Sequence, residues 1–241
     1  MNELAKDTPV GDWAAHRPQA ICVLERYGVD YCCGGEKPLT DACHDAGVDL
    51  QQVFDELNRT EPAKCGESPT NWRDASLTKL CDHIEQTHHA FLREQLPRLT
   101  RWIDKVVASH VEKHPNLLEV QSTFQELRAE LEPHMMKEEC VLFPAIRKIE
   151  ESSPPFAFPF GSVRNPIRAM ENEHDDAGNA LRRLHELTHG YTIPNDVCTT
   201  YRAMLEGLQR LEADLHEHIH KENNILFPRA AKLEQTIHVA S

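Results

Sequence analysis

Two histidine–glutamate pairs in the second half of the chain share the same four-residue spacing and similar surroundings. They are His134 with Glu138 and His218 with Glu222, and both segments follow the pattern H-x-x-K-E-x-x-[VI]-L-F-P. Side chains four residues apart lie on one face of a helix, roughly 5–6 Å apart between Cβ atoms. An imidazole and a carboxylate placed in this way can bind the same metal ion, so the repeated spacing indicates metal chemistry.

The helix faces that carry these pairs are otherwise apolar, which indicates burial. The face expected on residues 116–150 consists of Leu117, Val120, Phe124, Leu127, Leu131, His134, Glu138, Val141, Ala145 and Ile149. The face around His218 and Glu222 is similar, and His174 interrupts a third apolar face. Burying even a neutral polar group without a partner costs about 2–7 kcal/mol. A single buried histidine is more often a hydrogen-bonded core residue, but five interruptions on three faces favour ligands.

A fourth ligand helix is expected upstream, but its phase leaves two histidines open. His89 lies 45 residues before His134, and His174 lies 44 residues before His218. The apolar spacing in the first part of this helix favours His88, whereas the second part favours His89. The matched separations favour His89 slightly. Four imidazoles and two carboxylates, related by a pseudo-twofold axis, suit two iron or manganese ions bridged by the carboxylates, and the absence of adjacent thiolates disfavours zinc.

The elements that must position these residues are helices, and the expected fold class is all-α. Four long helices over about 76–109, 116–150, 163–189 and 195–235 predict an up-down four-helix bundle. Pro97 is expected to kink the first of them. Shorter helices are expected near 18–28, from 39 onward and over 50–57. Composition then predicts a small cysteine-containing helical domain over 1–58, a linker over 59–75 and the bundle over 76–235.

The composition argues against several classes of partner. The formal net charge of -13 repels the phosphates of nucleic acids and of anionic lipids. No apolar stretch is long enough to span a bilayer, and the first residues lack the order of a secretory signal, so we expect a cytoplasmic protein without nucleic-acid or membrane partners. Its eight cysteines are then mostly reduced thiols. Five of them fall in helical patterns and are interpreted as core or semi-buried: Cys22, Cys43, Cys81, Cys140 and Cys198.

Cys32 and Cys33 form the second candidate site. They are adjacent in the loop segment DYCCGG, which is not part of any helical pattern. A disulfide between neighbouring residues has poor geometry, so a stable bridge is not expected. The two thiols could bind a cluster fragment, exchange with a partner's disulfide or pass electrons. Free cysteines are also often simply buried, but the loop position favours a function.

Taken together, these motifs resemble the repair-of-iron-centres family, in which a ScdA-type domain precedes a hemerythrin-like bundle. The matching segments are DYCCGG at 30–35, REQLP at 93–97, HMMKEE at 134–139, ExEHD at 171–175 and HIHKENNILFPRA at 218–230. The resemblance implies a di-iron centre, oxo-bridged and bridged by the two glutamates, at His89, His134, Glu138, His174, His218 and Glu222. It also places Glu130 and Glu173 near an access channel, where they could relay protons or iron instead of carrying ordinary solvated charge. The further histidines at 88, 216 and 220 are interpreted as surface residues or as neighbours of the ligands.

The family is implicated in restoring iron–sulfur clusters damaged by oxidative or nitrosative stress. The resemblance therefore implies a protein that supplies iron to damaged iron–sulfur proteins. The alternative is a di-iron protein that binds or reduces nitric oxide, as a detoxifying enzyme, a carrier or a sensor. Nitric oxide or oxygen species would be its small ligands, and a homodimer is compatible with these observations.

Overall fold

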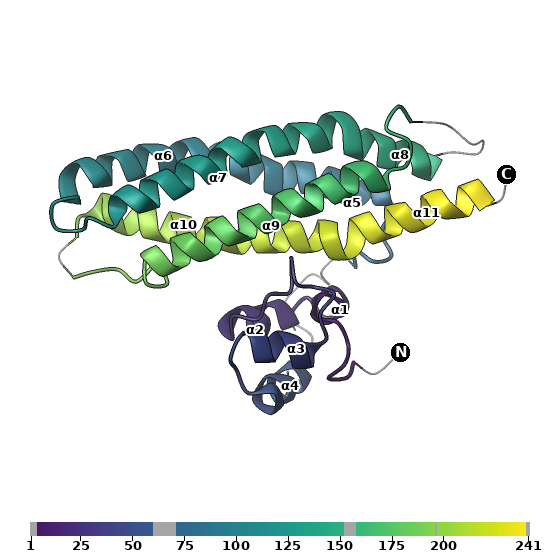
Figure 1. The fold of residues 1–241 in the computed structure, drawn as a ribbon, viewed down its shortest axis with the longest axis horizontal. Coiled ribbons are helices and arrows are strands. Elements are labelled where there is room, and N and C mark those ends of the chain that lie inside the picture. Colours follow the sequence, from purple (N-terminus) through teal and green to yellow (C-terminus); the bar gives the residue numbers. More distant parts are fainter. Residues whose placement is uncertain (1–3, 60–70, 152–157, 196, 240–241) are drawn as a thin grey trace. The chain divides into compact units, whose positions relative to one another are not determined.

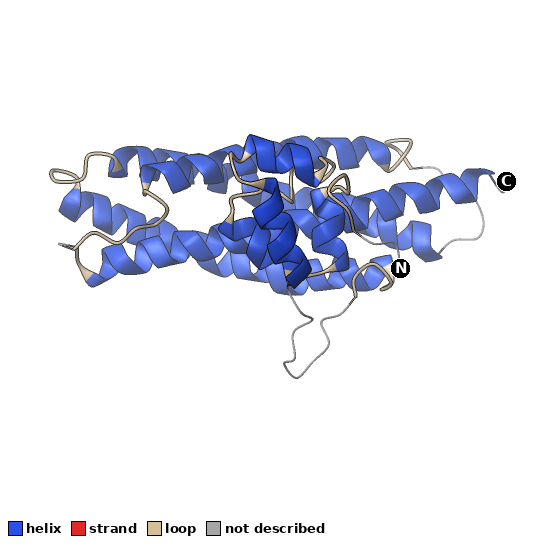
Figure 2. Ribbon diagram, turned by 90° about the horizontal axis from the view of Figure 1, so that it is seen from below, coloured by secondary structure: helices blue, strands red, loops and turns tan. Residues whose placement is uncertain are grey.

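The structure, a computed structural model, describes residues 4–59, 71–151, 158–195 and 197–239, and the regular secondary structure within these ranges is helical (Figure 1). Figure 2 shows no β-strand among them, and the only β-type pairings there are isolated bridges between Pro9 and Pro38 and between Phe158 and Gly161. The all-α prediction is therefore confirmed. No helix within these ranges has the length and apolar character needed to cross a membrane. Most of the expected linker and residues 152–157 of the loop at 152–161 lie outside the described residues.

Contacts between Cα atoms divide the chain into two compact units. One comprises residues 1–80, 149–155 and 217–241, and the other comprises 81–148 and 156–216. One boundary, at residue 217, falls inside a single continuous helix, α10 (Thr199–Lys221). The residues at the end of α10 therefore continue a helix that begins in the second unit.

The first unit contains a group of short helices with a core of their own. These are α1 (Val10–His16), α2 (Ala20–Arg26), α3 (Leu39–Asp45) and α4 (Leu50–Arg59). The core includes Trp13, Leu24 and Leu39. Gly28 and Gly47, with φ of 64° and 68°, follow α2 and α3 in the left-handed conformation that glycine adopts most easily. The sequence predicted the last three helices and missed α1, although α1, α2 and α3 each contain seven residues.

The second unit is a bundle of long helices. It contains α6 (Ala90–His110), α7 (Leu117–Lys137), α9 (Arg164–Leu187) and the greater part of α10. Figure 1 shows these helices lying side by side, and α7 packs against both α6 and α9. All four contribute to one apolar core, for example through Leu99, Phe124, Leu181 and Leu208. The predicted helical bundle is thus confirmed, and Pro97 lies inside α6, which is helical on both sides of it.

Among the residues that the structure describes, three π-helices interrupt the expected long helices. They are η1 (Glu85–His89) between α5 (Leu77–Ile84) and α6, η2 (Glu138–Leu142) between α7 and α8 (Phe143–Glu151), and η3 (Glu222–Leu226) between α10 and α11 (Phe227–Val239). Single π-helical turns are rare in proteins, and those that do occur are often found at functional sites. In both copies of the repeated motif, Phe-Pro follows the π-helix. Proline has no N–H, so it cannot donate the α-helical hydrogen bond to the carbonyl four residues before it. The two copies of the motif therefore share both this missing hydrogen bond and a π-helix just before the proline.

Candidate metal centre

The six residues expected as ligands lie at the π-helices or in the middle of α9. His89 ends η1, His134 lies in the last turn of α7, Glu138 begins η2, His174 lies within α9, His218 lies in the last turn of α10 and Glu222 begins η3. All six side chains are buried, with at most 3% of each residue exposed. Buried carboxylates in a helical bundle need a compensating charge, so their surroundings decide what the site can do.

Within the second unit, four of these side chains converge through their donor atoms. Glu138 Oε2 lies 3.2 Å from His89 Nε2, and Glu138 Oε1 lies 3.4 Å from His134 Nε2. His134 Nε2 lies 3.1 Å from His174 Nε2. In the first unit, His218 Nε2 lies 3.2 Å from Glu222 Oε1. In each of these contacts the Nε2 atom of a histidine faces an oxygen or nitrogen atom of another candidate metal ligand.

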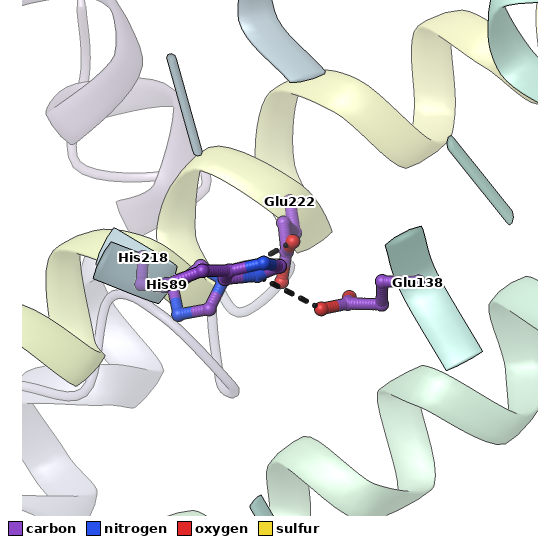
Figure 3. A group of neighbouring side chains, drawn as sticks. All are labelled: His89, Glu138, His218 and Glu222. Carbon is purple, nitrogen blue, oxygen red and sulfur yellow. Dashed lines mark ion pairs between the residues drawn. The ribbon is translucent and has the colours of Figure 1, made fainter. Parts of the chain in front are cut away.

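The donor atoms form two overlapping groups. The first consists of His89, Glu138, His218 and Glu222, and the second of His134, Glu138, His174 and Glu222; within each, the atoms lie within 4.8 Å of one another. Figure 3 shows the first group, with the imidazole edges facing the carboxylates. Both glutamates belong to both groups, whereas each histidine belongs to one. This is the arrangement expected for two metal ions bridged by two carboxylates.

The hydrogen-bond pattern around the histidines fits bound cations. His89 Nδ1 lies 2.7 Å from Glu139 Oε1, and His134 Nδ1 lies 2.8 Å from Glu173 Oε2. Since a carboxylate accepts, Nδ1 carries the proton, and in a neutral imidazole Nε2 then presents its lone pair. Both lone pairs face oxygens of the buried carboxylate of Glu138. Lone pairs repel carboxylates unless a cation lies between them, so the donor set fits metal ions.

His88, the alternative that the helical phase left open, belongs to neither group. It is buried, and its Nδ1 lies 2.9 Å from Asp214 Oδ1. The structure therefore brings His89 to the glutamates and places His88 against another helix. Of the other two additional histidines, His216 is half-buried. His220 is buried, and this burial, with the nearby charge of Lys221, lowers its pKa to about 4.

Sequence reasoning missed Glu139, which follows the ligand Glu138 directly. Its carboxylate accepts from His89 Nδ1 and from Arg93 Nη2, the latter at 2.5 Å. Partial burial acts to raise the pKa of Glu139, but these hydrogen bonds outweigh it and lower the pKa overall. The carboxylate is therefore ionised. The doubled glutamate in HMMKEE was the available signal, although it does not indicate which histidine the second glutamate contacts.

The two acids expected near an access channel have different environments. Glu173 lies beside His134 and accepts from Lys137 Nζ at 2.5 Å. Partial burial acts to raise the pKa of Glu173, but the hydrogen bonds from Lys137 and His134 lower it overall. Glu130 is exposed on α7, four residues before His134. Glu173 therefore contacts a candidate ligand directly, and Glu130 lies one helical turn from the same histidine.

Cys32 and Cys33 lie in a loop that is held by hydrogen bonds. Asp30 Oδ1 accepts from the backbone N–H groups of Cys32 and Cys33 at 3.1 and 3.0 Å. Their sulfur atoms are 3.9 Å apart and neither cysteine forms a disulfide. The hydrogen bond with Cys33 and burial raise the pKa of Cys32. Asn224 Nδ2, in η3, donates to the carbonyl oxygens of Tyr31 and Cys32 at 3.1 and 3.2 Å.

The interpretation of the other cysteines was only partly right. Cys43 and Cys81 are buried, but Cys22, Cys140 and Cys198 are exposed. The helical pattern did not show that Cys22 and Cys140 lie on the outer faces of their helices, or that Cys198 precedes α10. The remaining cysteine, Cys65, lies outside the described residues.

Comparisons with known proteins agree with this arrangement. Residues 82–230 match the model of the hemerythrin HHE cation binding domain, and residues 6–61 match that of the ScdA_N domain, a domain of unknown function. The chain is 38% identical over 227 residues to the iron-sulfur cluster repair protein YtfE of Escherichia coli O157:H7. The aligned region covers 93% of this chain and 97% of the relative. Proteins of the same name from Citrobacter koseri and Escherichia fergusonii show the same identity and coverage.

A hemerythrin domain of this kind binds a di-iron centre, and the two histidine–glutamate groups fit one. The domain match covers more than half of the chain, and the relatives match nearly all of it. The chain therefore belongs to the hemerythrin-domain family that includes the iron-sulfur cluster repair protein YtfE.

Proposed function

We propose that this protein helps to repair iron–sulfur clusters damaged by oxidative or nitrosative stress, by supplying iron to the damaged proteins. The observation that carries the proposal is the pair of donor groups that share Glu138 and Glu222. The proposed ligands are His89, His134, Glu138, His174, His218 and Glu222, with both glutamates bridging. The relatives named as iron-sulfur cluster repair proteins support the same function.

The types of donor suit the release of iron to a cluster protein. The proposed ligands are imidazoles and carboxylates, whereas iron–sulfur clusters are held mainly by cysteine thiolates. Soft thiolate ligands select iron in cluster sites, so the free cysteines of a damaged protein are suitable acceptors. When bound, the iron ions supply Lewis-acid and one-electron redox chemistry. The chain's own part is to keep the proton of His89 and His134 on Nδ1, where it is donated to Glu139 and Glu173, so that the Nε2 lone pairs face inward.

Four further residues have proposed roles in moving iron or protons. Cys32 and Cys33, with Asp30, form a third group that could hold a metal ion. We propose that the two thiols take up iron in transit or exchange with a partner's disulfide. For Glu130 and Glu173 we propose a relay of protons or iron, supported for Glu173 by its contact with His134.

The remaining proposals rest on sequence. We propose domain boundaries at 1–58 and 76–235 with a linker at 59–75, damaged iron–sulfur proteins as partners, and nitric oxide or oxygen species as small ligands. A homodimer and a cytoplasmic location are proposed on the same basis.

The test is iron transfer under anaerobic conditions. Iron-loaded protein is incubated with the apo form of an aconitase-type cluster protein, a thiol and sulfide, and both the client's activity and the donor's iron content are followed. We expect the client to regain activity while the donor loses iron. The variant Glu138→Leu/Glu222→Leu should bind little iron and restore nothing. Glu126→Leu, the same change at an exposed position of α7, is the matched control and should behave like the wild type.

Two results would overturn direct iron supply. In one, the client recovers equally well with the double variant, so that the bound iron has no part in the repair. In the other, iron stays with the protein while added nitric oxide is consumed over many turnovers in the presence of a reductant. That second result would identify a nitric oxide-reducing di-iron enzyme. If the iron transfer succeeds, Cys32→Ser/Cys33→Ser is the next variant to test in the same assay.

A further inference from the structure

Two chains of polar contacts run from solvent to the metal centre. In the first, the exposed guanidinium of Arg93 contacts Glu139, which in turn accepts from His89 Nδ1. In the second, the ammonium group of Lys137 contacts Glu173, which accepts from His134 Nδ1. The side chains of Glu139 and Glu173 are 23% and 31% exposed, so each carboxylate lies between bulk water and a buried imidazole.

A carboxylate in this position has a definite effect on a metal ligand. It holds the imidazole in the tautomer with the proton on Nδ1, fixes the plane of the ring and makes Nε2 a stronger donor. The surface cation restricts the carboxylate to one orientation.

The two chains of contacts reach different donor groups. His89 belongs to the group with His218, whereas His134 belongs to the group with His174. At each metal position, therefore, a histidine is anchored by a partly exposed acid, His89 by Glu139 and His134 by Glu173. The shared ligands Glu138 and Glu222 are common to both positions and cannot distinguish them.

We propose that Glu139 and Glu173 are positioning residues that control the retention of iron separately, Glu139 at the His89/His218 position and Glu173 at the His134/His174 position. The proposal rests on the proposed di-iron centre but not on the destination of the iron. It can therefore fail while iron supply to clusters is correct, and it can hold while iron supply to clusters is wrong. A protein with this construction can lose one iron ion while the other remains anchored.

The experiment measures the release of iron from loaded Glu139→Ala, Glu173→Ala and the double variant to a chelator under anaerobic conditions. Loss of a carboxylate that anchors a ligand histidine typically weakens metal binding about 10–100-fold. We expect each single variant to release one iron equivalent about 10–100-fold faster than the wild type, with the second equivalent at the wild-type rate. The double variant should release both quickly. Glu126→Ala, an exposed acid on α7, is the control for loss of a surface charge.

A second measurement separates positioning from general loosening of the fold. The iron-shifted signals of exchangeable imidazole N–H protons in the NMR spectrum report each ligand Nδ1–H. Glu139→Ala should move one such signal and Glu173→Ala a different one, and Glu139→Gln, which keeps an acceptor oxygen, should give a smaller change. The proposal is overturned if each single variant releases both equivalents quickly, if neither changes the release, or if both variants move the same signal.

Discussion

Replacing Glu138 by leucine should stabilise the metal-free protein. The Glu138 side chain is fully buried, and its carboxylate oxygens lie 3.2 and 3.4 Å from the Nε2 atoms of His89 and His134. Replacing a whole buried ion pair by apolar residues of similar size often stabilises a protein, by about 1–4 kcal/mol, whereas removing one partner of a pair destabilises it. The imidazoles that face Glu138 are neutral in the metal-free protein and are not ion-pair partners, so the stabilising range applies to the carboxylate alone. For a domain of 150–250 residues, 1 kcal/mol changes the Tm by roughly 2–4 °C, so we expect a rise of about 2–16 °C.

The iron-loaded protein should respond in the opposite direction. A metal ion that binds only the folded state stabilises it by about 2.7 kcal/mol when its free concentration is 100 times Kd, which corresponds to roughly 5–11 °C in Tm. Because Glu138 belongs to both donor groups, the leucine variant should lose this gain at both metal positions. The order of the two Tm values should therefore reverse when iron is added.

The assay is thermal unfolding followed by circular dichroism at the helical band, under anaerobic conditions, with excess chelator or with ferrous iron. Glu126→Leu, which makes the same change on the exposed side of α7, should leave both Tm values nearly unchanged. The reasoning is refuted if metal-free Glu138→Leu melts well below metal-free wild type. That result would mean that the buried carboxylate is stabilised by the protein alone, and the inference of a cation from its burial would lose its basis.

Two further predictions concern other histidines. His89→Ala should lower the iron content. His88→Ala should keep the iron but lower the free energy of unfolding by about 1–3 kcal/mol, because Asp214 loses its hydrogen-bond partner. Iron analysis and chemical unfolding distinguish the two outcomes, and loss of iron in His88→Ala alone would contradict the assignment. Hydrogen bonds from the start of α10 and from His110, 3.3 Å away, lower the pKa of the exposed Cys198 to about 7. Alkylation of Cys198 should therefore reach half its maximal rate near pH 7, and His110→Ala should move this midpoint upward; an unchanged midpoint would exclude the imidazole as a cause.

Five of the six candidate ligands could be identified from sequence because each interrupts an apolar face. Such an interruption is costly unless the polar group has a partner, and that cost is visible in the residue pattern without any coordinates. The partners of Glu139 and Asp214 could not be identified in the same way. Glu139 contacts a histidine 50 residues away, and Asp214 contacts one 126 residues away. Which side chains meet across a bundle depends on helix rotation, which the sequence pattern constrains only loosely.

Val141 shows how the π-helices disturb this kind of reasoning. Continuous α-helical spacing from His134 and Glu138 placed Val141 on the buried face, but it is 44% exposed, whereas Leu142 is 1% exposed. A π-helical turn contains one more residue than expected, since its hydrogen bonds join residues five apart. Within η2 the buried position is therefore displaced by one residue, and the prediction for Val141 was wrong for this geometric reason, whereas Ala145 and Ile149 are buried as predicted.

The same displacement explains why the helical phase could not choose between His88 and His89. Before η1, the buried face runs through Leu80 and Ile84 to His88, at α-helical spacing. After η1 it runs from His89 through Leu92 and the leucines that follow, again at α-helical spacing. Both readings of the apolar pattern were correct for their own part of the helix, and the conflict between them marked the extra residue. Two adjacent histidines are consequently buried, one against Asp214 and one in the candidate donor group with Glu138. A one-residue conflict of phase next to a candidate ligand is thus itself a sequence signal for a π-helical turn.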